Sequence, residues 1–109
     1  MKDVRPTIVR LLSNIIDIKP DYAEAWNRRA SLFFLKKDYG RAVADIRVVL
    51  ALEPRHFGAW SGLGIILEQI GDDKEALLAF RHAYALNPHM DKVKDSIDSL
   101  AKKVEGRDI

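Results

Sequence analysis

Apolar residues recur along this chain at intervals of three and four, the spacing that places side chains on one face of an α-helix. One stripe is Trp26, Ala30 and Phe33, and a polar interval separates it from the next stripe, which begins at Ala42. Extended along the chain, the pattern predicts six helices. We expect them over residues 4–18, 22–36, 39–52, 57–70, 73–86 and 90–104.

The pattern of the first half returns 34 residues later. Trp26 is followed at that interval by Trp60, and Pro20 by Pro54 and then by a third proline. A period shared by such different residue types indicates an internal repeat, in which each unit is a pair of helices. Small residues at Ala42 and at its equivalent one period later predict close helix contacts. The tryptophans are predicted to fill the core rather than to stack on a ligand.

Helix ends are marked by capping residues and by one glycine. An acidic or polar side chain just before a helix accepts hydrogen bonds from its first free N–H groups, and glycine after a helix permits a left-handed turn. The expected signals are Asp21 with Glu24 for the second helix, Asp38 for the third, Gly71 at the end of the fourth, and Asp72 with Glu75 for the fifth.

One set of residues keeps the same register in both units: Trp26, Ala30, Phe33, Tyr39, Ala42, Ile46 and Pro54, followed by Trp60, Leu63, Gly64, Leu67, Gly71, Ala76, Phe80, Ala83 and Pro88. In these residues and their spacing, the repeated units resemble tetratricopeptide repeats. Two positions depart from the family pattern, because Arg29 stands where leucine is usual and Lys37 where Gly71 marks the turn one period later.

The resemblance implies an all-α fold, an antiparallel helix-pair solenoid of about six helices. We expect a single domain made of a half-repeat helix over 1–20, repeats over 23–56 and 57–90, and a C-terminal capping helix and tail over 91–109. In this family the first helix of each pair lines a concave groove. The chain is therefore expected to be a non-enzymatic scaffold for a protein or peptide partner.

Beside the core stripe, the first helix of each pair carries a second stripe, and in the family such positions contact the partner. A complete clamp for a C-terminal carboxylate is not expected, because only Asn27 matches that pattern cleanly. The predicted partner-binding residues are Glu24, Asn27, Arg28, Ser31, Phe34, Ser61, Ile65 and Glu68.

Composition and charge argue against other classes of function. The formal net charge is only +2, and the basic residues are interleaved with acids, which weakens a nucleic-acid interpretation. The chain has no cysteine, and its three histidines lack the i, i+4 spacing of a helical metal site. No phosphate-binding glycine loop is present, so we expect no catalysis and no cofactor. Asp72 and Asp73 lie at a helix start, where acids serve as caps.

The first residues do not resemble a signal peptide, since an acid and a proline interrupt any apolar core. No apolar run is long enough to span a bilayer. These observations predict a soluble chain without a membrane partner, cytoplasmic by default.

The helix expected over 4–18 is apolar around about half of its circumference, more than one packing face requires. One side is expected to pack on the next helix. The other side predicts an alternative function, self-assembly into a homodimer, unless upstream residues of a longer parent protein cover it. The residues predicted to mediate self-association are Ile8, Val9, Leu12 and Ile16.

Overall fold

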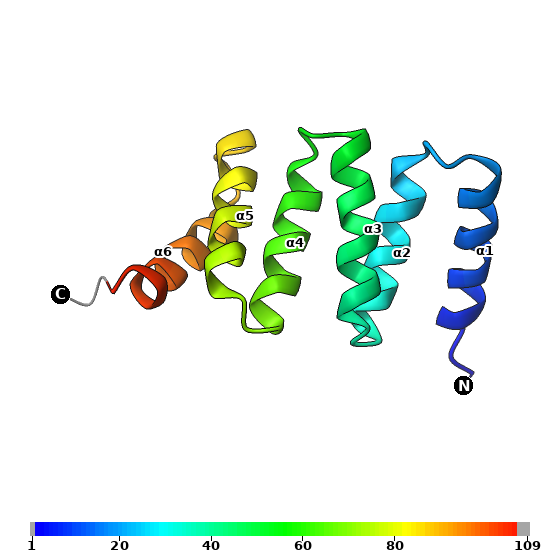
Figure 1. Ribbon diagram of the computed structural model, residues 1–109, viewed down its shortest axis with the longest axis horizontal. Helices are drawn as coiled ribbons and strands as arrows, with labels where there is room; N and C mark the ends of the chain where they lie inside the picture. The colour runs from blue at the N-terminus through cyan, green and yellow to red at the C-terminus, as the bar shows by residue number, and fades with distance from the viewer. Residues whose placement is uncertain (1, 107–109) are drawn as a thin grey trace. The chain divides into compact units, whose positions relative to one another are not determined.

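The computed structural model describes residues 2–106, and these form helices joined by short turns (Figure 1). No strand occurs within this range. The helices are α1 (Arg5–Ile18), α2 (Ala23–Leu35), α3 (Tyr39–Leu52), α4 (Phe57–Gln69), α5 (Asp73–Leu86) and α6 (Asp91–Glu105). The all-α class and the helices expected from the sequence are confirmed, with ends that differ by at most one residue.

The chain divides into two compact units. Unit 1 (Met1–Pro54) contains α1 to α3, and unit 2 (Arg55–Ile109) contains α4 to α6. In unit 1, α2 packs against both α1 and α3, and in unit 2, α5 packs against both α4 and α6. Whether the chain behaves as a single domain stays a prediction. None of the described helices is long and apolar enough to cross a membrane.

Most of the predicted helix ends are confirmed. The Asp38 carboxylate accepts a hydrogen bond from the N–H of Arg41, and the Asp72 carboxylate accepts one from the N–H of Glu75, each at 3.4 Å. The capping box predicted at Asp21 is wrong. The N-cap of α2 is Tyr22, which makes no side-chain capping bond, because the helix begins one residue later than the box requires.

The two turns within the repeats adopt the same left-handed backbone with different residues. Gly71 has φ = 84°, as its predicted role at the end of α4 requires, and Lys37 has φ = 65°. A residue with a β-carbon is strained in this region, so unit 1 carries a local strain that unit 2 avoids.

Each helix pair has small, buried residues on its second helix. Ala42 of unit 1 and Ala76 of unit 2 are both completely buried, as predicted. On α4, a β-carbon added at Gly64 would lie 2.7 Å from the Phe80 ring of α5, closer than atoms can pack. The absence of a side chain at Gly64 therefore lets the Phe80 ring lie directly against the α4 backbone.

The two tryptophans lie at the edge of the core, half-buried rather than enclosed. Trp26 packs against a cluster that includes Leu12 and Ile16 of α1, and its Nε1 donates a hydrogen bond to the carbonyl of Pro20 at 2.9 Å. Trp60 stacks on His82 with ring centroids 4.2 Å apart. Their large aromatic surfaces contribute to packing, and both retain a solvent-facing side.

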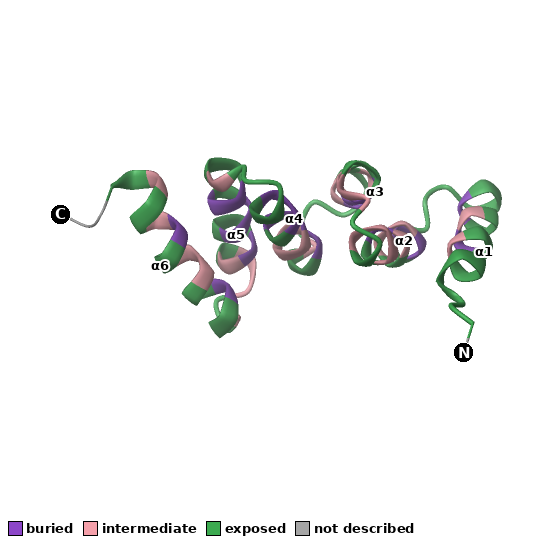
Figure 2. Ribbon diagram, turned by 90° about the horizontal axis from the view of Figure 1, so that it is seen from below, coloured by how far each residue is buried: buried purple, intermediate pink, exposed green. Residues whose placement is uncertain are grey.

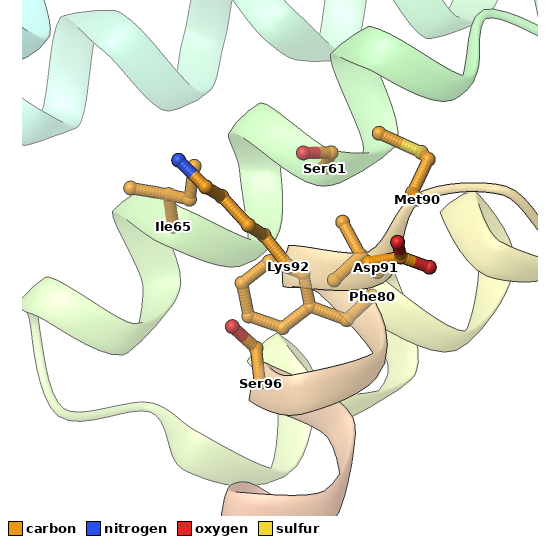
Figure 3. A pocket seen from close by; sticks show the side chains of 8 residues that line it. Ser61, Ile65, Phe80, Met90, Asp91, Lys92 and Ser96 are labelled. Carbon is orange, nitrogen blue, oxygen red and sulfur yellow. The ribbon is translucent and has the colours of Figure 1, made fainter.

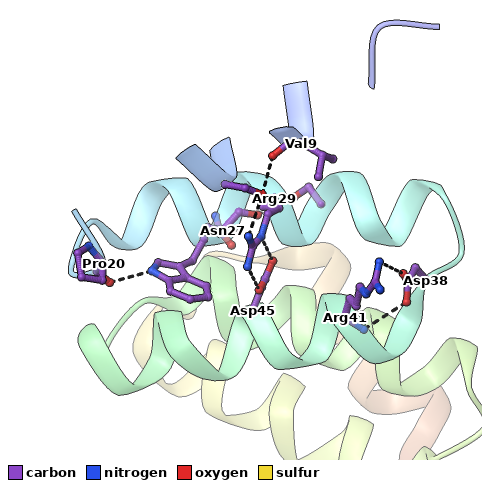
Figure 4. A network of polar contacts seen from close by, with 10 residues as sticks. Val9, Pro20, Asn27, Arg29, Asp38, Arg41 and Asp45 are labelled. Carbon is purple, nitrogen blue, oxygen red and sulfur yellow. Dashed lines mark hydrogen bonds and ion pairs between the residues drawn. The ribbon is translucent and has the colours of Figure 1, made fainter. Parts of the chain in front are cut away.

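Unit 1 also contains a polar network that the sequence analysis did not predict (Figure 4). Arg29 of α2 donates hydrogen bonds from Nε and Nη2 to the two carboxylate oxygens of Asp45 on α3, at 2.8 and 2.9 Å. Its Nη1 donates to the hydroxyl of Ser13 on α1 at 3.0 Å. Asp45 is 4% exposed, and the hydrogen bonds from Arg29 to it raise the pKa of Arg29 above its ordinary value. One guanidinium thus connects all three helices of unit 1.

Candidate partner-binding site

Unit 2 contains a hollow of ≈ 430 Å³ between α4, α5 and the start of α6 (Figure 3). We call it the α4–α6 hollow. Its apolar lining includes the buried Phe80 and Val93. Its full lining is Ser61 and Ile65 of α4, Phe80 of α5, Met90 before α6, and Asp91, Lys92, Val93 and Ser96 of α6.

The position of the hollow follows from the packing of α4 on α5. Phe80 lies against the bare backbone at Gly64, so its ring lines the hollow together with Ser61, one turn earlier on α4, and Ile65, the residue after Gly64. Val93 then brings the first turn of α6 onto the same floor. A groove with an apolar floor and a few convergent polar groups is the usual form of a ligand-binding site.

The polar groups of the hollow have no partners within residues 2–106. Neither Asp91 nor Lys92 forms an ion pair there, and neither the Ser61 nor the Ser96 hydroxyl forms a hydrogen bond there. Lys92 extends toward Ile65 (Figure 3), so its methylene groups cover the apolar floor while its ammonium group remains in water. The hollow can therefore bury an apolar group and hydrogen-bond a polar one.

Of the predicted partner-binding residues, Ser61 and Ile65 line the α4–α6 hollow. Glu68 is exposed on α4 but does not line the hollow. The remaining five belong to α2 of unit 1. These five are Glu24, Asn27, Arg28, Ser31 and Phe34.

These five residues of α2, which we call the α2 stripe, make local contacts with one another and with Tyr39. Arg28 and Glu24 form an exposed ion pair of 3.3 Å, one turn apart. The Ser31 hydroxyl donates a hydrogen bond to the backbone carbonyl of Asn27 at 3.2 Å, and the half-buried Phe34 ring lies 5.7 Å from that of Tyr39. An exposed ion pair of this kind contributes little to stability. Breaking the pair so that Glu24 or Arg28 contacts a partner therefore costs little free energy.

Sequence reasoning missed most of the hollow. The missed residues are Phe80, Met90, Asp91, Lys92, Val93 and Ser96. One signal was present, because Lys92 follows Glu24 of the predicted partner-binding stripe at twice the repeat interval of 34 residues. Carrying the repeat register into α6 would have found it, although nothing in the register indicates that Phe80 forms the floor.

The structure corrects two of the predicted self-association residues. Leu12 and Ile16 are buried against Ala25, together with Trp26 and Leu32 of α2, and are unavailable for a second chain. Val9 is half-buried, whereas Ile8 is exposed. Figure 2 shows that much of α1 remains exposed. The exposed apolar side chains of this helix and its N-cap, which we call the exposed α1 face, are Val4, Ile8, Leu11, Ile15 and Ile18.

The histidines have local structural contacts. The Nδ1 atom of His56 accepts a hydrogen bond from the N–H of Ala59 at 3.0 Å and caps α4, while His82 stacks on Trp60. Within the described part of the chain, no group of three or more histidines, cysteines or acids is placed to hold a metal ion.

Comparison with known proteins agrees with the repeated helix pairs of the fold. Residues 38–91 match the tetratricopeptide repeat family. A tetratricopeptide repeat-containing protein of Rhizobium etli is 41% identical over 101 residues, which are 93% of this chain and 50% of that protein. The chain belongs to the tetratricopeptide-repeat family. It spans about half the length of this relative.

Solved tetratricopeptide-repeat structures share the fold. The Arabidopsis OM64 tetratricopeptide-repeat domain superposes with a TM-score of 0.84 at 24% identity, covering 88% of this chain and 79% of that one. The first such domain of Spaghetti (RPAP3), bound to the HSP90 peptide SRMEEVD, gives 0.84 at 18% identity, covering 89% and 77%. Proteins built from tetratricopeptide repeats commonly mediate protein–protein interactions and are generally non-enzymatic scaffolds.

Proposed function

We propose that this chain is a non-enzymatic interaction scaffold that holds an extended segment of a partner protein in the α4–α6 hollow of unit 2, and that the α2 stripe of unit 1 is a separate partner-binding surface. The observation that carries the proposal is the hollow itself, where the apolar floor at Phe80 adjoins Lys92 and two hydroxyl groups without partners in the described chain. These groups fit a segment that has both an apolar side chain and polar atoms.

The lining indicates the chemistry of that segment. An aliphatic side chain fits over Phe80 and Val93 beside the flexible Met90, and a carboxylate of the same segment reaches the ammonium group of Lys92. The Ser61 and Ser96 hydroxyls hydrogen-bond its backbone. The peptide bound by the Spaghetti domain, SRMEEVD, contains both an apolar methionine and several acids, which supports this class of segment.

The first experiment measures binding of labelled SRMEEVD by fluorescence anisotropy to the wild-type chain and to Ile65→Ser. Ile65 is 43% exposed, so the substitution removes apolar surface from the hollow without opening the core. Ile70→Ser is the matched control, because Ile70 is 51% exposed and does not line the hollow. We expect Ile65→Ser alone to weaken binding by about tenfold. Equal affinity of the two variants would place the segment elsewhere, and no binding to the wild type would reject this class of segment.

The second experiment isolates the charge. Lys92→Gln should weaken binding of SRMEEVD and remove part of its salt dependence, whereas Lys74→Gln on α5 should change neither. The peptide SRMQQVN, which lacks the side-chain carboxylates of the two glutamates and the aspartate, should bind both chains alike. If Lys92→Gln still discriminates between the two peptides as the wild type does, Lys92 is not the carboxylate partner.

A second candidate function is structural self-assembly. The exposed α1 face favours it, because five aliphatic side chains lie in water on one helix. Full burial of a fully exposed side chain of this kind contributes roughly 1.5–3 kcal/mol, and these five side chains are 39–84% exposed, so covering the face is favourable by a fraction of that for each. Sedimentation equilibrium of the 109-residue chain tests self-assembly directly. A monomer at high micromolar concentration excludes it.

A further inference from the structure

The α4–α6 hollow has two charges of opposite sign on its rim, at consecutive residues of α6. Asp91 and Lys92 are both exposed, and neither forms an ion pair within residues 2–106. Consecutive residues of a helix are about 100° apart around its axis, so the two side chains leave α6 in different directions. Figure 3 shows Lys92 extending toward Ile65, whereas the Asp91 carboxylate lies on the Met90 side. The hollow therefore has a positive end and a negative end.

The size of the hollow decides which residues of a bound segment meet these charges. Phe80 and Val93 are only 1% and 6% exposed, so they form an apolar floor on which one apolar side chain of the segment rests. Ser61 and Ile65 line the hollow one helical turn apart, a rise of about 6 Å, which about two residues of an extended segment span. The residues that directly flank the apolar one therefore reach the charged rim.

Asp91 also has a structural role at the start of α6. It lies in the first turn, where the helix dipole favours a negative charge, and the N-cap Met90 makes no side-chain capping bond. This role leaves the exposed carboxylate of Asp91 in water, where it can bind a cation. The two roles have different consequences, because stabilising the helix start affects every bound segment alike, whereas binding a cation favours segments that carry one.

We propose that Asp91 binds a basic side chain of the partner segment, so that the hollow selects segments in which a basic and an acidic residue flank an apolar one on opposite sides. This inference rests on the proposed function and adds the charge pattern of the segment to it. Each charge of such a segment meets its opposite, at Asp91 and at Lys92, whereas a segment with acids on both sides places a carboxylate against Asp91. An exposed ion pair of this kind changes affinity about two- to fivefold, so Asp91 acts mainly on specificity.

The role of Asp91 is tested by changing the charge on both sides of the contact. The probe SRMEEVD has an arginine directly before its methionine and a glutamate directly after it, and the matched probe SQMEEVD lacks the basic side chain. By fluorescence anisotropy we expect the wild-type chain to prefer SRMEEVD about two- to fivefold, and Asp91→Asn to bind both probes alike. Asp91→Glu should keep the preference. Asp95→Asn is the control, since Asp95 is exposed on the same helix but does not line the hollow, and it should also keep the preference.

The outcomes separate this inference from the function on which it rests. If Asp91→Asn prefers SRMEEVD as strongly as the wild type does, the inference is wrong and the proposed function stands. If Asp91→Asn weakens the binding of both probes by the same factor, Asp91 acts only through the start of α6, and the inference is again wrong. If the wild-type chain binds neither probe, the proposed function and the inference fall together.

Discussion

Arg29 and Asp45, which pair between α2 and α3, occupy the positions that Leu63 and Ala79 occupy one period later on α4 and α5. Asp45 is the only charged residue that is buried among residues 2–106. A buried ion pair adds little net stability over an apolar pair, but removing one member leaves an unpaired buried charge. Unit 1 thus depends on both side chains, and the same contact in unit 2 needs neither charge.

The ion pair predicts a strong asymmetry between single and double substitutions. Asp45→Ala should lower the free energy of unfolding by about 2–4 kcal/mol, because Arg29 keeps its charge and loses its partner. The double variant Arg29→Leu with Asp45→Ala copies the residues of unit 2 and should recover most of this loss. Urea denaturation of the three chains measures both effects. If the double variant is as unstable as the single one, the cost does not arise from the unpaired charge.

Replacing glycine by alanine should change stability in opposite directions at two helical positions. Gly64→Ala places a methyl group 2.7 Å from the Phe80 ring, and the required shift should cost about 1–3 kcal/mol. Gly40→Ala in α3 meets no atom within 4 Å and should stabilise the chain by about 0.5–1 kcal/mol. Thermal melting compares them. A neutral Gly64→Ala would mean that α4 and α5 are further apart than described.

The two left-handed turns provide a third pair. Lys37→Gly should relieve the strain at φ = 65° and raise stability by about 0.5–1 kcal/mol. Gly71→Ala should introduce that strain at φ = 84° and lower stability by about 1–2 kcal/mol. Denaturation midpoints distinguish the variants. Loss of stability in Lys37→Gly would show that the lysine side chain contributes a contact that outweighs the backbone strain.

The α2 stripe is tested by Asn27→Ala combined with Phe34→Ala. Loss of the ring contact with Tyr39 should cost about 1 kcal/mol of stability. The free energy of binding the peptide should decrease by more than this. Leu35→Ala is the control, since Leu35 is exposed on the same helix and lies outside the stripe. Anisotropy with labelled SRMEEVD measures capture at a temperature where both chains remain folded. Unchanged capture by the double variant removes the α2 stripe from the proposed partner-binding surfaces.

The repeat, the helices and most of their ends could be predicted from the sequence. Helical periodicity, the spacing of Trp26 and Trp60, and caps such as Asp38 are local signals, because they depend on residues within one or two turns of each other. The failure at Asp21 has the same origin, since a shift of one residue at a helix start changes which side chain reaches the free N–H groups. Arg29 and Lys37 depart from the family pattern in the sequence itself. The sequence does not predict the ion pair that Arg29 forms or the left-handed backbone at Lys37.

Those consequences depended on which helices meet and on which side. The pairing of Arg29 with Asp45 joins side chains 16 positions apart, and periodicity places each on a face without naming its partner. The burial of Leu12 and Ile16 was decided by how far α1 rotates onto α2, which a helix apolar over half its circumference leaves open. The α4–α6 hollow likewise exists because Phe80 fits against a bare backbone at Gly64. Sequence alone determined the elements and their order, whereas side-chain volumes at the helix contacts decided which apolar surfaces were buried and which remained for a partner.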